Sequence, residues 1–243
     1  MAKLGVFDVS VRYGKVPALN DVSLHLNEGE RMFISGPNGA GKSSLLRAIS
    51  GAVATSHGRI EMDGTILTGR PPEAIARQGL SMVPEGREIF GSMTVEENLR
   101  VGTGIRRDRS AIESDIAEIY DAFPILGQRR NASAGALSGG QQQMLAIGRA
   151  LMTNPKLMMV DEPSLGLAPN IVDQVYDTLV ALQQERGLTL LIVEQSSARA
   201  ARVGGRMVLL RGGAIVDQGD AREFAEKDLL KDAYFGGAKT EDA

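Results

Sequence analysis

A glycine-rich segment near the N-terminus constrains this 243-residue chain more than any other feature. Residues 36–43 read Gly-Pro-Asn-Gly-Ala-Gly-Lys-Ser, which matches the P-loop pattern, with a short apolar segment before it and a helical pattern after it. Glycines in such a loop let successive backbone N–H groups turn toward phosphate oxygens, and the following helix adds positive potential at its N-terminus. A glycine-rich turn beside an ordinary surface lysine is the alternative, but it does not account for both flanking elements. The chain is therefore predicted to bind a nucleoside triphosphate.

The side chains of this loop suit a triphosphate that is bound with Mg²⁺. Lys42 can neutralise the β- and γ-phosphates, and Ser43 can place its hydroxyl on the metal ion. The predicted nucleotide-binding residues of the loop are Gly36, Pro37, Asn38, Gly39, Ala40, Gly41, Lys42, Ser43 and Ser44.

Hydrophobic patterning places the loop in an α/β chain. Alternating segments over 6–12 and 22–26, and short apolar runs over 31–35, 80–83, 157–160, 188–193 and 207–210, predict strands. Helices are expected from residue 42 to 51 and from about 171 to 185, with capping boxes at Thr94–Glu97 and Ser110–Glu113 opening two more and Pro124 closing the second. Strands that alternate with helices indicate a mostly parallel sheet covered on both faces, and residues 84–154 form a helical insertion.

Two acids follow the buried run that ends at Val160. Asp161 and Glu162 therefore stand at the carboxyl end of a strand, where open α/β sheets bind ligands. Asp161 is suited to the Mg²⁺ shell, and Glu162 to polarising the attacking water. Two solvated acids at a turn are also common after a strand. The pair therefore indicates a nucleotide site only in combination with the phosphate loop.

A second anion-binding helix start is predicted at residues 137–141, Leu-Ser-Gly-Gly-Gln. Ser138 and Gln141 fit a capping box, and the following apolar positions suit a helix. Gly139 and Gly140 then occupy the first turn, where each would weaken the helix by up to about 1 kcal/mol relative to alanine. Glycine is expected there if something must approach the backbone closely, and exposed N–H groups at a helix N-terminus favour phosphate. An ordinary capped helix remains the alternative.

Composition excludes several other classes of site and location. The formal net charge is −3 with scattered Lys and Arg, which argues against a general nucleic-acid binder. There is no cysteine and only His25 and His57, so disulfides are excluded and a zinc centre is not expected. The N-terminus does not resemble a signal peptide, and no apolar run approaches the roughly 20 residues of a membrane span, which predicts a cytoplasmic chain.

The Leu-Ser-Gly-Gly-Gln segment, placed between a phosphate loop and an Asp-Glu strand end, resembles the signature of ABC-type ATPase domains. The resemblance extends from Tyr13 to about Gln218. It implies a P-loop NTPase fold with a mostly parallel core sheet, an N-terminal antiparallel β subdomain and a helical signature subdomain. The corresponding boundaries are one domain over 1–237 (core 1–83 and 155–237, helical subdomain 84–154) and a flexible tail over 238–243.

The same resemblance implies a head-to-tail pair of subunits, with each signature segment capping the γ-phosphate held by the other subunit. Ser138, Gly139, Gly140 and Gln141 would then serve the partner's ATP. Tyr13 matches the aromatic residue that stacks on adenine, although a tyrosine packed on the rim of the core is an equal reading of its position.

Three positions depart from the usual ABC pattern. Glu85 stands where a Mg²⁺-binding glutamine is usual; a carboxylate also binds hard ions, or it could point away and pair with Arg87. Gln195 replaces a histidine that reaches the γ-phosphate, and glutamine can donate a hydrogen bond but cannot titrate. Leu167 stands where the turn after Glu162 commonly carries an aspartate. Hydrolysis is still expected because Glu162 is present.

At these positions the chain is similar to the F-type ATPase subunit of branched-chain amino acid importers. Close relatives of that subunit serve urea and amides. That resemblance implies two permeases, a second ATPase subunit and a periplasmic solute-binding protein as partners, with this chain peripheral on the inner face of the cell membrane. An ABC ATPase of DNA repair or translation is disfavoured because such chains carry tandem cassettes or a long coiled coil. A low-turnover regulatory nucleotide-binding module stays open, as does pairing with itself or with a different ATPase.

Overall fold

The computed structural model describes residues 2–227, and the predicted tail over 238–243 lies outside them. The chain divides into two compact units, which are described separately: residues 1–69 together with 191–243, and residues 70–190. The strand β8 (Thr189–Val193) crosses the boundary between the two ranges and contributes residues to both. Within residues 2–227, no helix is both long and apolar enough to cross a membrane.

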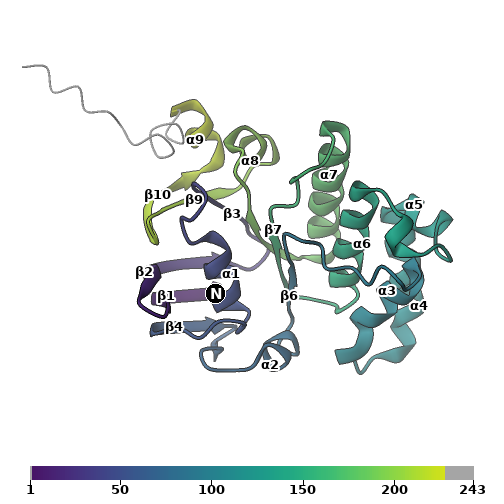
Figure 1. The fold of residues 1–243 in the computed structure, drawn as a ribbon, viewed down its shortest axis with the longest axis horizontal. Coiled ribbons are helices and arrows are strands. Elements are labelled where there is room, and N and C mark those ends of the chain that lie inside the picture. Colours follow the sequence, from purple (N-terminus) through teal and green to yellow (C-terminus); the bar gives the residue numbers. More distant parts are fainter. Residues whose placement is uncertain (1, 228–243) are drawn as a thin grey trace, which may run out of the picture. The chain divides into compact units, whose positions relative to one another are not determined.

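The first unit combines an antiparallel sheet with part of a parallel one (Figure 1). The antiparallel sheet has the strand order β2-β1-β4-β5, and the second has the order β10-β9-β3-β8, in which β3 and β9 run parallel and β10 is antiparallel to β9. The bounds are β1 (Ala2–Tyr13), β2 (Val16–Asn27), β3 (Arg31–Ser35), α1 (Lys42–Ile49), β4 (His57–Met62), β5 (Thr65–Ile66), α8 (Ser197–Val203), β9 (Arg206–Arg211), β10 (Ala214–Asp220) and α9 (Ala221–Lys227).

The alternating pattern predicted for β1 is interrupted at Phe7. Val6 and Val9 are buried, but Phe7 is exposed and lies under the guanidinium of Arg59, 4.7 Å from its ring centroid. Asp8 has a φ of 50°, and the register with β2 shifts between Val6 and Val9. This bulge places one extra residue in the strand, so the period of two that the sequence suggests does not hold across it.

The second unit contains the helical segment between strands β6 and β7, which pair in parallel (Figure 1). Its bounds are α2 (Pro72–Ala76), β6 (Leu80–Val83), α3 (Val95–Val101), η1 (Gly102–Ile105), η2 (Arg109–Ala111), α4 (Ile112–Ala122), α5 (Pro124–Gln128), η3 (Ala134–Ala136), α6 (Gly139–Leu151), β7 (Leu157–Asp161) and α7 (Pro169–Arg186). The strand order in this unit is β8-β7-β6.

Local signals at the helix ends explain most of these bounds. Thr94 and Glu97 form the predicted capping box at α3, and Gly187, with a φ of 63°, ends α7. The predicted box at Ser110 is wrong: Ser110 lies in the short 3-10 helix η2, and α4 begins after Ala111 with no side-chain cap. The core of this unit includes the buried β6 and β7 positions and the inner face of α6, where Gly148 has no room for a side chain between Ile119 and Leu99.

Candidate functional site

The phosphate loop lies in the first unit, between the buried strand β3 and helix α1. Two of its glycines are required by close backbone packing. A Cβ atom on Gly36 would lie 2.1 Å from the carbonyl oxygen of Leu210, and one on Gly41 would lie 2.5 Å from that of Ala18. Both glycines also have a positive φ. The strand β9 and the start of β2 therefore hold the loop closely at both ends.

Helix α1 begins without a side-chain cap. Its N-cap residue is Gly41, so no side-chain oxygen there accepts a hydrogen bond from the first amides of the helix. An α-helix leaves its first N–H groups without intrahelical partners. A phosphate is a suitable acceptor for such groups, and the helix dipole favours its negative charge. The structure therefore has the local geometry expected of a phosphate-binding loop.

Lys42 is buried at the base of the loop. Its Nζ donates to the carbonyl oxygens of Gly36, at 2.8 Å, and Pro37, at 3.2 Å. The backbone carbonyl groups at the start of the loop thus hold the Lys42 ammonium in place. Ser43 and Ser44 follow in the first turn of α1 and are partly accessible.

Tyr13 and Gln195 both lie beside the phosphate loop. Tyr13 is 46% exposed at the end of β1, and its hydroxyl lies 3.5 Å from that of Ser44. A ring with this exposure has a face available for stacking, which a ring packed into the core would lack. The amide of Gln195, which follows β8, donates to the Oδ1 atom of Asn38 over 3.4 Å. Its neighbour Glu194 is instead buried and paired with Arg199 at 3.0 Å.

The two acids occupy the predicted strand end in the second unit. Asp161 is the last residue of β7 and is 3% exposed, whereas Glu162 is half-buried. Glu162 has a φ of 48°, an uncommon left-handed conformation for a non-glycine residue. Such strain of the backbone occurs preferentially at functional sites. The left-handed conformation of Glu162 turns the chain sharply after the strand. The carboxylate of Asp161 is therefore buried, whereas that of Glu162 is partly accessible.

Glu85 follows β6 and is exposed. The alternative in which it pairs with Arg87 is wrong, because no ion pair joins these two side chains in the described structure. The side chain of Arg87 is directed to another partner: its Nη2 lies 3.4 Å from the carbonyl oxygen of Leu165, in the turn after Glu162.

The signature segment forms the predicted capping box at the start of α6. The Oγ of Ser138 accepts from the backbone N–H of Gln141 at 3.3 Å, and the Oε1 of Gln141 accepts from that of Ser138 at 3.0 Å. Gly139 and Gly140 lie between them in the first turn. A Cβ on Gly140 would lie 2.5 Å from the Cγ2 of Ile171, so this glycine lets α6 pack on the start of α7. Ile171 was not predicted, because nothing in the local sequence signals a contact over 31 residues.

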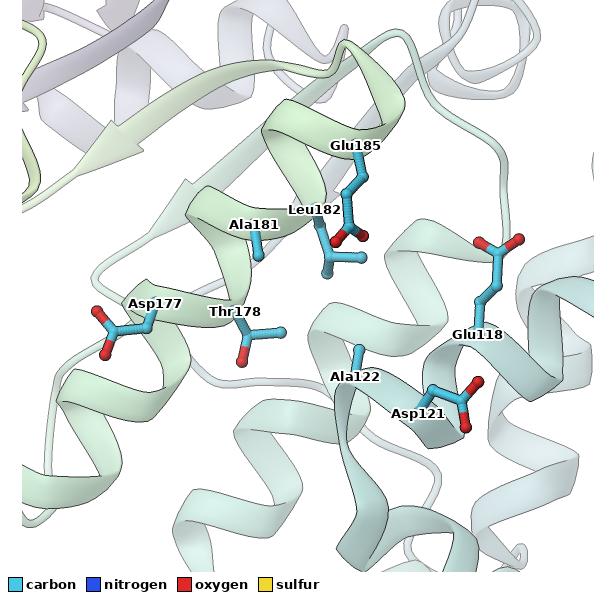
Figure 2. A pocket seen from close by; sticks show the side chains of 8 residues that line it. All are labelled: Glu118, Asp121, Ala122, Asp177, Thr178, Ala181, Leu182 and Glu185. Atoms are coloured by element: carbon cyan, nitrogen blue, oxygen red, sulfur yellow. The ribbon is translucent and has the colours of Figure 1, made fainter.

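A separate groove in the second unit lies between α4 and α7 and has a volume of about 490 Å³. Figure 2 shows Glu118, Asp121 and Ala122 from α4 on one side and residues of α7, among them Asp177 and Glu185, on the other. Four residues that line this cavity are acidic, and one of them, Glu118, is paired with Arg186. The excess of negative charge disfavours a triphosphate there. This groove is therefore unsuited to nucleotide phosphates, in contrast to the uncapped loop at α1.

Comparison with known proteins identifies the family of the chain. The ABC transporter family model matches residues 19–165. The chain is 42% identical to the high-affinity branched-chain amino acid transport ATP-binding protein BraG of Pseudomonas aeruginosa, covering 94% of this chain and 97% of that one. It is 32% identical to the probable branched-chain amino acid transport ATP-binding protein LivF of Archaeoglobus fulgidus, covering 92% and 94%.

A solved nucleotide-free ATP-binding cassette from an ABC transporter has the same fold. It superimposes with a TM-score of 0.85 at 27% identity, covering 98% of this chain and 100% of that one. The sequence resemblance and the predicted α/β fold are both confirmed. The chain belongs to the ABC transporter family, as one of its ATP-binding, ATP-hydrolysing subunits.

Proposed function

We propose that this chain binds Mg-ATP between its own phosphate loop and the signature segment of a second ATPase subunit, and that hydrolysis drives uptake of a small polar solute. The observation that carries the proposal is the occurrence of two helix starts with glycine at the N-cap or in the first turn, at α1 and α6, in one chain. Each start supplies backbone N–H groups for phosphate. A site divided between two subunits is complete only when ATP brings them together, which converts binding energy into closure.

The roles of the side chains follow from their environments. Lys42 neutralises the phosphates, Tyr13 stacks on adenine, Gln195 donates a hydrogen bond near the γ-phosphate, and Glu162 accepts a proton from the attacking water. Ser138, Gly139, Gly140 and Gln141 present the first turn of α6 to the partner's nucleotide.

The oxygen donors of the chain suit Mg²⁺. Asp161 is a nearly buried carboxylate at a strand end, Ser43 is a hydroxyl in the first turn of α1, and Glu85 is an exposed carboxylate. Hard divalent cations prefer such ligands, together with phosphate oxygens and water. When bound, Mg²⁺ would neutralise charge that develops on the phosphates.

Branched-chain amino acids are the proposed solutes, because BraG and LivF are both described as branched-chain amino acid transport ATP-binding proteins. Urea, amides or another small solute remain the second candidate, because an ATPase subunit need not contact the cargo. The proposal includes transmembrane permeases, a solute-binding protein and a peripheral position on the cytoplasmic face of the membrane. Copurification of the chain with its membrane partners, followed by solute-uptake assays, tests the cargo directly.

Steady-state ATPase measurement tests the motor function. Glu162→Gln is expected to lower kcat by about a hundredfold or more, because the group that accepts the proton is lost, while ATP still binds. Lys42→Ala is expected to abolish ATP affinity because the phosphate charge is no longer neutralised. Negligible turnover by the unmodified chain would favour the regulatory module instead, and unchanged turnover in Glu162→Gln would assign the base to another residue.

A further inference from the structure

We propose that Arg87 is a positioning residue for ATP hydrolysis, which fixes the first turn of α6 against the segment after β6 and the turn after Glu162. The inference rests on the proposed function. Arg87 belongs to no motif that the sequence singled out for nucleotide binding. It nevertheless touches two of the three segments of the second unit that carry candidate site residues, and it belongs to the third.

The side chain of Arg87 covers the first turn of α6. A Cβ atom on Gly139 would lie 3.3 Å from its Nη1 and 3.4 Å from its Nη2. The same Nη2 reaches the carbonyl oxygen of Leu165 at 3.4 Å. The guanidinium therefore lies against the signature glycine and contacts the turn that begins at Glu162. A rigid planar group is suited to fixing both at once, whereas a lysine would supply only a point charge.

The backbone of Arg87 is held in an uncommon conformation. Its φ is 63°, and that of Glu88 is 46°, so two successive non-glycine residues lie in the left-handed region. Such strain persists only where the surroundings determine it. Here the backbone N–H of Arg87 donates to Pro84 at 3.0 Å, and its carbonyl accepts from the Nη2 of Arg149 at 3.1 Å.

Arg149 belongs to α6, the same helix whose first turn the side chain of Arg87 contacts. Its guanidinium lies over the ring of Phe90, 5.2 Å from the centroid, and Phe90 is tied by both backbone groups to the buried Asn98. Helix α6 thus holds the backbone of Arg87 through Arg149, and the side chain of Arg87 contacts the N-terminal turn of the same helix. A shift of the segment carrying Glu85 is thereby linked to a shift of Ser138–Gly140.

Charge gives a second argument. Within the described residues Arg87 forms no ion pair, and its guanidinium lies beside the positive end of α6. A cation is unfavourable at a helix N-terminus, because it is repelled by the partial positive charge there. The arrangement becomes favourable when an anion binds at the first turn. The partner's terminal phosphate is such an anion.

The test compares Arg87→Ala and Arg87→Lys with Arg109→Ala, a control arginine that is exposed and makes no ion pair with any residue of the range 2–227. The readouts are kcat, KM for ATP, affinity of the dilute single chain for ATP, and ATP-driven dimerisation in a Glu162→Gln background. Arg87→Ala is expected to lower kcat and to weaken dimerisation by about tenfold or more, since misplaced groups are costly in catalysis. The affinity of the dilute single chain should stay within about twofold, because that site is the phosphate loop. Arg87→Lys should restore only part of the loss, and Arg109→Ala should match the unmodified chain.

Unchanged kcat and dimerisation in Arg87→Ala would overturn the inference, as would an equal loss in Arg109→Ala. If Arg87→Ala does not fold, full activity of Arg87→Lys would overturn it, since a point charge would then suffice. The proposed function fails separately, if the unmodified chain neither hydrolyses ATP nor associates in its presence.

Discussion

At the scale of single residues, Glu85 departs from the usual family pattern, in which a glutamine is proposed to bind Mg²⁺. It is exposed, and in the part of the chain that the structure describes its carboxylate forms no ion pair with Arg87 or with another residue. Both a carboxylate and an amide oxygen can serve a hard cation. We therefore predict that the charge of Glu85 matters less than its oxygen atom.

Replacement of Glu85 by glutamine should leave ATPase activity within about threefold, because the amide retains one oxygen ligand. The measurement is kcat and KM as a function of Mg²⁺ concentration. Glu88→Gln is the matched control, because Glu88 is exposed in the same segment. A collapse of activity in Glu85→Gln alone would mean that the negative charge has its own task.

At the scale of elements, helix α3 is stabilised by a complete capping box. The backbone N–H of Thr94 donates to the carboxylate of Glu97 at 2.7 Å, and the Thr94 hydroxyl accepts from the N–H of Glu97 at 3.1 Å. The hydrogen bonds from the backbone and then the side chain of Thr94 lower the pKa of Glu97. Stability from this carboxylate is therefore fully present above the ordinary pKa of glutamate, and it is lost as the pH falls through the lower value in the folded chain.

Replacement of Thr94 by alanine should lower the free energy of unfolding by about 1 kcal/mol at neutral pH, because the N-cap acceptor is lost. Chemical denaturation at pH 7 and again near the acid limit of folding measures the effect, which should shrink on acidification. Ser110→Ala is the matched control and should change stability by less than about 0.5 kcal/mol, since Ser110 caps no helix. Equal losses in both variants would contradict the assignment of the cap.

Elements with strong local signals were the ones that the sequence predicted. The strand β6 matches its predicted bounds. The capping box at Ser138 could be predicted because its two partners lie only three residues apart in the sequence. The strands β4, β5 and β10 were missed. In β10, exposed residues dominate and no alternation appears, so only its pairing with β9 defines it. The contacts of Gly140 with Ile171 and of Arg87 with Leu165 were missed for the same reason: each joins residues distant in sequence.

At the scale of the whole molecule, the candidate site residues are predicted to belong to two different nucleotide sites. The phosphate loop would serve the ATP of its own chain, and the start of α6 would serve that of a partner. A symmetric pair of chains then has two equivalent sites, each built from both chains. Defects in the two halves should consequently complement each other when they are carried by different chains.

This division predicts that two inactive variants recover activity on mixing. Lys42→Ala removes the phosphate-binding ammonium. Ser138→Asp retains a good N-cap but places a negative charge where the partner's phosphate would bind, and Ser138→Asn is its neutral control. In an equimolar mixture half of the pairs combine both variants, and each such pair has one intact site of two. ATPase activity of about a quarter of the unmodified value is expected if the two sites act independently. Activity no higher than the mean of the two variants measured separately would place both helix starts at the nucleotide of a single chain.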